Sequence, residues 1–333
     1  MPCLGTILAF GRWGIPARGV ALALCISPIC ITRAPCEPGA ATPEFYKAIS
    51  ETRHYMTSPR GEVPHSEDAQ DLRDLAILQL VRTAYESPEV VSRYASVGLW
   101  PSEESLILDY FPDEARILDL GCGAGRTTVA LAEIGLPAFG IDISELMIDV
   151  AREQARQLGV EELTEFAVMD TRRLEGIQDE GFDGALYSYN GLELVPGIAG
   201  KRRVLSEVYR VLRPGGRLIF CTHSLLALNR YAPMRMRAFV RFLLGQCGLP
   251  VRERELGERF IDDELEEARY LQILPPGSWR RMLRAAGFRI LYCNTRTRIE
   301  QRQPPRAWSV FADGERFFVA EKTGELAEPA DSL

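Results

Sequence analysis

From Ala115 onward, short apolar segments alternate regularly with amphipathic ones, and this alternation constrains the fold more than any other feature. The apolar segments, which we predict to be buried strands, are 115–120, 138–142, 164–170, 182–189 and 217–223. Helical periodicity fills much of the sequence between them, at 127–135, 144–159 and 200–212. Such alternation predicts an α/β fold with a doubly wound, mostly parallel sheet. Ligands of such sheets bind beyond the carboxyl ends of the strands.

The sequence on either side of this alternation divides into further segments. Two stretches of helical pattern, Ser66–Tyr85 and Ser102–Tyr110, predict an N-terminal helical cap over 44–112. We expect an α/β domain over 113–323, in which 224–275 is an inserted helical lid. Segments 289–298 and 316–321 are expected to be antiparallel strands that close a seven-stranded sheet. Residues 324–333 are predicted to be a flexible tail.

Residues 1–43 differ from the rest, with three arginines, one acid and an apolar stretch at 19–31. We interpret them as a disordered or spurious extension, with a targeting peptide as the alternative.

Composition excludes several classes of protein. The 39 basic and 46 acidic residues give a net charge of −7, so no long-range attraction to nucleic acid is expected. No apolar run reaches the roughly 20 residues of a membrane span. Three histidines and eight cysteines without a C-x-x-C pair predict no metal site. Free thiols indicate a reducing, cytoplasmic location. The oligomeric state stays open.

The segment after the first predicted strand, Asp119-Leu-Gly-Cys-Gly-Ala-Gly125, carries the first chemical signal. Glycine permits positive φ and lacks a Cβ atom, so a ligand can approach the backbone closely. A dinucleotide-binding loop would have glycine at 126, where this chain has Arg126. An acid two residues before the first glycine suits a cationic ligand better than a pyrophosphate. A tight turn that serves packing alone is the alternative.

Acids also end the second and third predicted strands. Asp142 lies 19 residues after Gly123, where a carboxylate can accept hydrogen bonds from both ribose hydroxyls. Asp170 is placed to accept from an adenine amino group. Either acid alone could be a helix cap or a loop residue. Acids at three successive strand ends favour a nucleoside-containing cofactor.

Five motifs together carry a resemblance. ILDLGCGAGRTT, GIDIS, VMDTRRL, FDGALYSYNGLELV and VLRPGGRLIFCTHS occur in this order, and WRRMLRAAGF follows at 279–288. The chain therefore resembles the class I S-adenosylmethionine-dependent methyltransferases, nearest to bacterial small-molecule enzymes of the ubiquinone/menaquinone-biosynthesis type. The resemblance is strong over about 115–222. It implies a Rossmann-like fold, S-adenosyl-L-methionine as the cofactor and a small-molecule methyl acceptor.

The resemblance also implies roles for individual residues. The cofactor-binding residues would be Asp119, Gly121, Cys122, Gly123, Gly125, Asp142, Ile143, Asp170, Thr171 and Tyr187. Asp119 and the glycines would hold the methionine part, and Ile143 would pack on adenine. Tyr189, Glu193 and His223 are the candidate catalytic residues, although His223 and Tyr187 could equally be packing residues. Many relatives have a Glu-His pair where this chain has Glu193-Leu194, which excludes a histidine base at that turn.

Three other functions stay open, and one of them is an RNA or protein methyltransferase. A binding module without turnover would keep the same nucleoside site, and a nicotinamide-dependent oxidoreductase is disfavoured by Arg126. Two arginine-rich segments are ambiguous. Arg230, Arg235, Arg237 and Arg241 could grip an anionic or aromatic substrate, or pair with the seven acids between 255 and 267. Arg296, Arg298, Arg302 and Arg306 near Trp308 are interpreted as a solvated strand face, with an RNA-contacting edge as the alternative.

Overall fold

The computed structural model describes residues 67–261, 270–312 and 314–324. The extension 1–43, the first part of the expected cap, the acids at 262–267 and the tail beyond 324 lie outside these residues.

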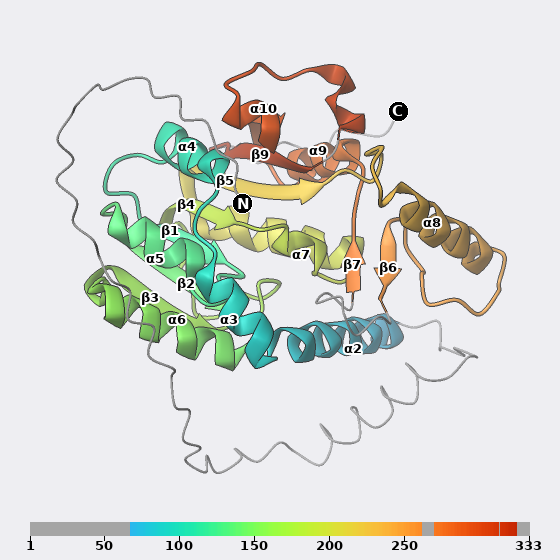
Figure 1. Cartoon of the computed structure of the whole chain (residues 1–333), viewed down its shortest axis with the longest axis horizontal. Coiled ribbons are helices and arrows are strands. Elements are labelled where there is room, and N and C mark those ends of the chain that lie inside the picture. The colour runs from blue at the N-terminus through green and yellow to red at the C-terminus, as the bar shows by residue number, and fades with distance from the viewer. Residues whose placement is uncertain (1–66, 262–269, 313, 325–333) are drawn as a thin grey trace, which may run out of the picture. The chain divides into compact units, whose positions relative to one another are not determined.

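A seven-stranded sheet forms the centre of the molecule, in the order β3-β2-β1-β4-β5-β9-β8 (Figure 1). The strands are β1 (Ile117–Leu120), β2 (Ala138–Asp142), β3 (Thr164–Val168), β4 (Phe182–Tyr187), β5 (Leu212–His223), β8 (Phe288–Thr295) and β9 (Glu315–Lys322). The first five are parallel, and β9 is antiparallel to both β5 and β8. The predicted doubly wound, seven-stranded α/β fold is confirmed. Segment 289–298 was expected to be all strand, but β8 ends at Thr295 and a short helix, α10 (Arg296–Glu300), follows.

Helices cover both faces of the sheet, because the central strands β1 and β4 are buried along nearly their whole length. On one face, α7 (Gly197–Val211) and α9 (Pro276–Ala285) pack through Val204, Leu205, Trp279 and Leu283. On the other, α4 (Pro101–Tyr110) and α5 (Arg126–Glu133) contribute Leu106, Ile107 and Leu131. Helix α6 (Glu145–Leu158) begins and ends as predicted: the Ser144 side chain accepts from the Met147 N–H, and Gly159 has a φ of 69°.

Two further helices of the expected cap, α2 (Glu67–Tyr85) and α3 (Pro88–Ser96), precede α4. Helix α2 packs Ile77 and Val81 against Phe260 and Tyr270, which lie far along the chain. Helix α3 places Val90 and Val91 with Met147 of α6. The N-terminal helices are therefore part of the α/β unit's packing.

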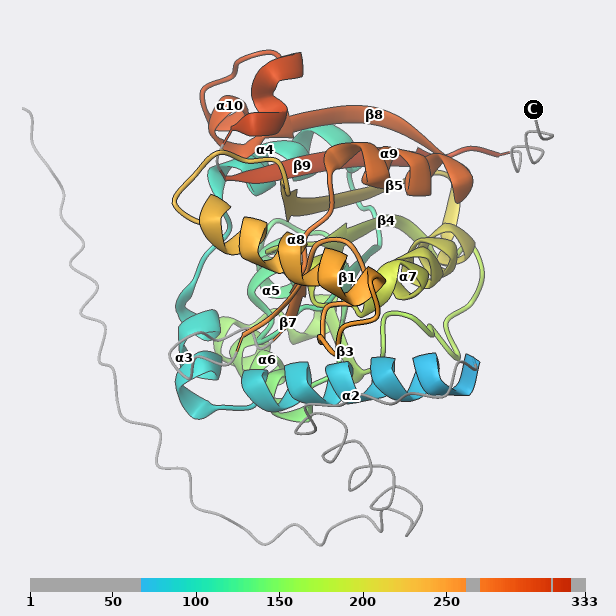
Figure 2. The same ribbon diagram turned by 90° about the vertical axis from the view of Figure 1, so that its right-hand side faces the viewer.

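The described residues of the segment expected to be an inserted lid form one α-helix and a small sheet. Helix α8 (Ala232–Gln246) is followed by β6 (Glu258–Phe260) and β7 (Tyr270–Gln272), which pair antiparallel. Figure 2 shows α8 in front of the central sheet, on the outside of the molecule. Among the described helices, none is both long and apolar enough to cross a bilayer.

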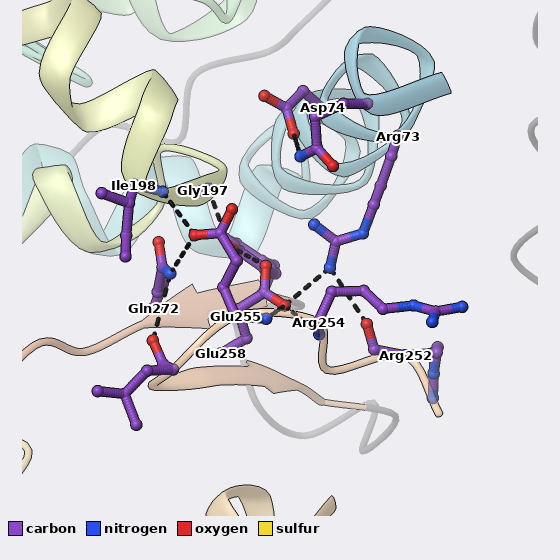
Figure 3. A network of polar contacts seen from close by, with 12 residues as sticks. Arg73, Asp74, Gly197, Ile198, Arg252, Arg254, Glu255, Glu258 and Gln272 are labelled. Carbon is purple, nitrogen blue, oxygen red and sulfur yellow. Dashed lines mark hydrogen bonds and ion pairs between the residues drawn. The ribbon is translucent and has the colours of Figure 1, made fainter. Parts of the chain in front are cut away.

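A buried polar network joins α2 to this insertion (Figure 3). The Arg73 guanidinium donates to Glu258 Oε2 at 2.8 Å and to the Arg252 carbonyl at 3.1 Å. Glu258 also accepts from the hydroxyl of Tyr270 and from the backbone N–H groups of Arg254 and Glu255. A single buried carboxylate thus connects the cap helix, the hairpin and the loop before it.

The same network reaches α7 at its first residues (Figure 3). Glu255 Oε2 accepts from the Ile198 N–H at 2.7 Å and from the Gln272 amide at 3.0 Å. Lys201 is fully buried and donates to the carbonyl of Val195 and to Gln272 Oε1. Burial lowers the pKa of Lys201 to about 7, against the raising effect of nearby carboxylates such as Glu193 and Glu258.

Candidate functional site

A pocket opens at the carboxyl ends of β1, β2 and β4. Its floor includes Gly121 and Gly123 of the turn after β1, and one side is formed by Asp142 and Ile143 after β2. Helix α2 contributes Leu78, Val81, Arg82 and Tyr85 to the opposite wall, and α3 contributes Tyr94. The lining includes no residue from the described parts of 224–275. In the described chain, the N-terminal helices close this pocket, not the insertion.

Positive φ angles shape the glycine turn. Gly121, Gly123 and Gly125 have φ values of 65°, 54° and 88°. A Cβ on Gly121 would lie 3.0 Å from the Tyr187 ring, and one on Gly125 would lie 2.9 Å from the Cβ of Ala151 in α6. A Cβ on Gly123 would meet only the Met147 sulfur, at 4.0 Å. Backbone conformation and close packing therefore explain Gly121 and Gly125, whereas Gly123 leaves open space above the turn.

Asp142 is fixed by backbone donors. Its Oδ2 accepts from the Gly123 N–H at 3.0 Å, and its Oδ1 accepts from the Ser144 N–H at 2.9 Å. Burial raises the pKa of Asp142, although these hydrogen bonds oppose the shift. Each carboxylate oxygen has a second lone pair, so Asp142 can still accept two hydrogen bonds from a ligand.

Asp170 forms a bidentate pair with Arg172. The Arg172 Nε and Nη2 atoms lie 3.0 and 2.8 Å from Asp170 Oδ2. The same guanidinium lies 3.7 Å from Asp74 on α2. Burial raises the pKa of Asp74 to about 6, against the lowering effect of Arg172 and Arg73. Arg172 therefore links Asp170 in the pocket to Asp74 on the cap helix α2.

Asp119 lies beneath the glycine turn and does not line the pocket. It is fully buried, and its Oδ2 accepts from the hydroxyls of Thr127 and Thr128. Burial raises its pKa to about 6, in spite of these two hydrogen bonds. Among the described residues, its other oxygen, Oδ1, has no hydrogen-bond partner. A buried acceptor without a donor is costly to stability.

Four aromatic rings form a chain, and three of them, Tyr85, Tyr94 and Tyr189, line the pocket. The ring centroids of Tyr85 and Tyr94 lie 5.5 Å apart, those of Tyr94 and Tyr189 lie 5.4 Å apart, and those of Tyr189 and Trp100 lie 4.8 Å apart. Tyr189 and Asn190 both have positive φ, 51° and 62°. Two consecutive non-glycine residues in this region are strained, and such strain concentrates at functional sites. The turn after β4 thus holds Tyr189 in the pocket wall.

Arg126 anchors that wall through a buried ion pair. Its guanidinium donates to both oxygens of Glu103, at 2.7 and 2.8 Å, and to the Ser188 hydroxyl at 2.5 Å. The same group lies 5.1 Å from the Tyr189 ring centroid. Glu103 also accepts from the Ser188 hydroxyl and from the Trp100 N–H. The arginine that breaks the dinucleotide pattern therefore joins α5 to α4 and to the turn after β4.

His223 and Glu193 lie together at the end of β5. The His223 Nδ1 atom is 3.1 Å from Glu193 Oε2, and Glu193 Oε1 accepts from the Thr222 hydroxyl. Burial opposes a charge on His223, but the Glu193 carboxylate outweighs it and raises the pKa of His223 to about 9. The imidazole is therefore charged at neutral pH and bound to a carboxylate. Neither residue belongs to the pocket lining.

Comparison with known proteins agrees with this fold. Residues 117–216 match the profile of a family described as "Methyltransferase domain". This part of the chain is therefore a methyltransferase domain. A demethylmenaquinone methyltransferase from Clavibacter sepedonicus is 32% identical over 149 residues, which cover 45% of this chain and 57% of that relative. The chain spans about half the length of the curated relatives to which it is 32% identical.

Two further comparisons extend along more of the chain. A tRNA 5-carboxymethoxyuridine methyltransferase from Escherichia coli K12 is 27% identical over 61% of this chain and 74% of its own length. The crystal structure of a SAM-dependent methyltransferase from Methanosarcina mazei superposes with a TM-score of 0.54 at 23% identity. It covers 69% of this chain and all of that one. The structural likeness shows that the methyltransferase domain has the fold predicted from its motifs.

Most of the residues predicted from the motifs meet in the pocket of the methyltransferase domain. The lining includes Gly121, Cys122, Gly123, Asp142, Ile143, Asp170, Thr171, Tyr187 and Tyr189. Thr171 and Tyr187 contact each other through their hydroxyls at 3.2 Å. Asp119 and Gly125 support the turn from behind, and His223 and Glu193 lie apart.

The contribution of the cap helices to the pocket lining was not predicted from the sequence. Val81, Tyr85 and Tyr94 line the pocket, as does Arg126. Tyr85 is the last residue of α2, and Tyr94 lies near the end of α3. An aromatic residue at the end of a helix was the sequence signal that could have predicted their place in the pocket. Arg126 was noticed only as a departure from another motif.

S-adenosylmethionine, the cofactor of this family, fits the residues present. The open space above Gly123 lets a ligand approach the backbone of the turn, and the buried Asp119 carboxylate beneath the turn favours a cationic group on that ligand. Asp142 keeps the acceptor capacity that two ribose hydroxyls need, and Ile143 is an apolar neighbour for adenine. Within the described residues, no cluster of histidine, cysteine and acidic side chains could hold a metal ion.

Proposed function

We propose that this chain is an enzyme that transfers a methyl group from S-adenosylmethionine to a small-molecule acceptor. One observation carries the proposal: Asp142, fixed by the Gly123 N–H, and Tyr189, held in a strained turn, line the same pocket. The first position suits the ribose of the cofactor, and the second suits a methyl acceptor. The matched methyltransferase domain supports the reaction class.

The chain's contribution to the reaction is binding and positioning. When bound, S-adenosylmethionine supplies a methyl group already activated on a sulfonium sulfur, so transfer needs alignment and exclusion of water. Gly121, Gly123 and Asp142 hold the cofactor, with Asp170 near the adenine. Helices α2 and α3 separate the pocket from solvent through Val81, Tyr85 and Tyr94.

In this proposal, Tyr189 is the residue that contacts the acceptor. The His223–Glu193 pair acts through position, because an imidazole with a pKa of about 9 holds its proton at neutral pH. The His223 ring contacts both carboxylate oxygens of Glu193, and this contact fixes the end of β5. An acceptor that loses its proton readily, or only after methyl transfer, suits a site without a free base.

Calorimetric binding of S-adenosylhomocysteine tests the cofactor. Wild-type protein should bind it, and Asp142→Asn should bind at least about tenfold more weakly because a charged acceptor is lost. Asp149→Asn, an exposed acid on α6, is the control and should bind as wild type does. Binding of NADH in place of S-adenosylhomocysteine, or equal affinity in Asp142→Asn, would contradict the proposal.

An RNA acceptor is the second candidate, because one relative is a tRNA methyltransferase. The pocket, lined by Tyr85, Tyr94, Tyr187 and Tyr189, favours a small molecule, since a nucleotide within a duplex would have to be flipped out to enter it. Incubation with methyl-labelled S-adenosylmethionine separates the possibilities. Label in organic extracts supports a small-molecule acceptor, label in purified tRNA supports the second candidate, and cofactor binding without any labelled product supports a non-catalytic module.

We also propose a cytoplasmic location. The four described cysteines, Cys122, Cys221, Cys247 and Cys293, are free, which suits a reducing compartment.

A further inference from the structure

Helix α8 leaves one whole face apolar and exposed. Ala238 is its only buried residue, and the opposite side of the helix presents a continuous apolar stripe. The stripe consists of Met236, Phe239, Val240, Leu243 and Leu244, each between 38% and 62% exposed. A surface helix normally turns such a stripe towards the core. The face that α8 turns outwards therefore has no packing role in the described structure.

A second exposed apolar group lies beside the start of this helix. Leu228 and Trp308 are 75% and 82% exposed, and Phe311 is 41% exposed. The Leu228 N–H donates to the Phe311 carbonyl at 2.9 Å, which joins the loop before α8 to the short 3₁₀ helix η3 (Ala307–Phe311). We call these eight side chains the apolar face: Leu228, Met236, Phe239, Val240, Leu243, Leu244, Trp308 and Phe311. Exposed apolar groups on this scale mark an interaction site.

The segments that carry the apolar face are also strongly basic. Residues 224–252 and 296–311 contain nine arginines and a single acid, Glu300, in a chain whose net charge is −7. Some of these arginines are held internally, as Arg241 is by Glu253. Arg230, Arg237, Arg302 and Arg306 are exposed. These two segments thus have a net charge of opposite sign to that of the protein as a whole.

We propose that the apolar face docks on an anionic lipid surface. An interfacial helix buries an apolar stripe at the boundary between headgroups and acyl chains, and arginines beside it attract anionic headgroups. Tryptophan is favoured at that depth, where its ring meets both environments. Since α8 is too short and too polar to span a bilayer, the contact is a surface contact. This proposal does not depend on the methyl-transfer reaction.

The side chains favour lipid over other partners. Single-stranded RNA is bound by aromatic rings that stack on bases, but most of the apolar face is aliphatic or thioether, which offers bases no such platform. A symmetric contact with a second copy would bring these arginines together with the arginines of that copy, whereas an anionic membrane attracts them. Charge complementarity and the aliphatic stripe therefore point to the same occupant.

Vesicle flotation of the full chain tests the proposal. Vesicles of phosphatidylcholine alone are compared with vesicles containing equal parts of phosphatidylglycerol. We expect clear preference for the anionic vesicles, and weaker binding as salt rises from about 0.1 M to about 0.5 M. Leu243→Glu should weaken binding at least about tenfold, because a charge enters the interface. The double variant Arg237→Ser, Arg302→Ser should weaken it about tenfold or more, on anionic vesicles only.

Matched controls lie elsewhere on the surface. Leu158→Glu and Arg152→Ser alter an exposed leucine and an exposed arginine of α6, and both should bind as wild type does. Failure to float with anionic vesicles, or equal loss in Leu158→Glu and Leu243→Glu, overturns the proposal. Light scattering tests whether the apolar face binds a second copy of the chain. A dimer that dissociates in Leu243→Glu would assign the face to self-association and would also overturn the proposal. The proposal is also overturned if the protein binds tRNA and not vesicles, and if Leu243→Glu abolishes the tRNA binding.

Discussion

Two buried glutamates in this molecule have the same kinds of hydrogen-bond partners but lie in different parts of the fold. Glu103 on α4 and Glu258 on β6 are both almost completely buried, and each pairs with one arginine, Arg126 and Arg73 respectively. Each also accepts from backbone N–H and hydroxyl donors. Only one of the two arginines, Arg126, lines the pocket. The Arg73–Glu258 pair therefore holds the cap to the insertion, and the Arg126–Glu103 pair shapes the pocket.

The difference between the two pairs shows what a buried ion pair contributes to this fold. A buried ion pair gives little net stability, because desolvation offsets the Coulomb attraction, but breaking one leaves an uncompensated buried charge. The Arg73–Glu258 pair thus penalises any arrangement in which α2 leaves the hairpin. The Arg126–Glu103 pair penalises any arrangement in which Tyr189 and Ser188 leave the pocket wall.

The largest effect is expected from Glu258→Ala. This change leaves the Arg73 guanidinium buried without its partner and removes the acceptor of the Tyr270 hydroxyl. We expect a loss of about 3–5 kcal/mol in the free energy of unfolding, measured by urea denaturation. Glu153→Ala, in an exposed pair with Arg156, should lose less than about 0.5 kcal/mol. A loss in Glu258→Ala no larger than in this control would contradict the role given to the network.

A smaller loss of stability, with a loss of ligand binding, is expected from Glu103→Gln. Glutamine keeps the shape and one acceptor oxygen but removes the charge opposite Arg126, at a cost of about 1–3 kcal/mol. Because Arg126 then shifts against Tyr189, binding of S-adenosylhomocysteine should weaken as well. Glu258→Gln is the matched variant, and it should lower stability while the folded protein binds with unchanged affinity. Equal losses of affinity in both variants would remove the distinction between the two pairs.

The smallest effect is the pH dependence contributed by Lys201. Its pKa of about 7 in the folded state lies below the ordinary 10.5, so the unfolded chain binds more protons between these values. The free energy of unfolding should therefore rise with pH across that window. His223, with its pKa raised to about 9 from 6.5, contributes the opposite slope between pH 6.5 and 9.

The readout is therefore the difference between wild type and Lys201→Met. Urea denaturation at pH 7, 8 and 9, values within the window set by the two Lys201 pKa values, should give a difference that grows in favour of wild type. A difference that stays constant with pH would show that Lys201 keeps its ordinary pKa in the folded protein.

Much of the fold and part of the site were predictable from local sequence. The alternation of apolar and helical segments gave five parallel strands, and Ser144 and Gly159 marked the limits of α6. The glycine turn and Asp142 were predicted because their roles follow from local backbone geometry. Segment 296–298 was misplaced as strand, since the arginine-rich pattern there does not distinguish a strand from the short helix α10.

What local sequence could not decide was which distant residues meet. Asp119 is buried beneath the turn by Thr127 and Thr128, and His223 is bound to Glu193 some thirty residues before it. Tyr85 and Tyr94 enter the pocket because α2 and α3 cross the strand ends, a placement set by Phe260, Tyr270 and Met147.

The sequence by itself therefore determined the class of fold, the glycine turn and the acid that ends β2. These depend on φ angles, strand ends and helix starts within a few residues of each other. The tertiary structure alone decided the aromatic wall, the pairing of Arg126 with Glu103 and the separation of His223 from the pocket. These depend on which helices close over the sheet, and that closure is settled by buried contacts between segments far apart in the chain.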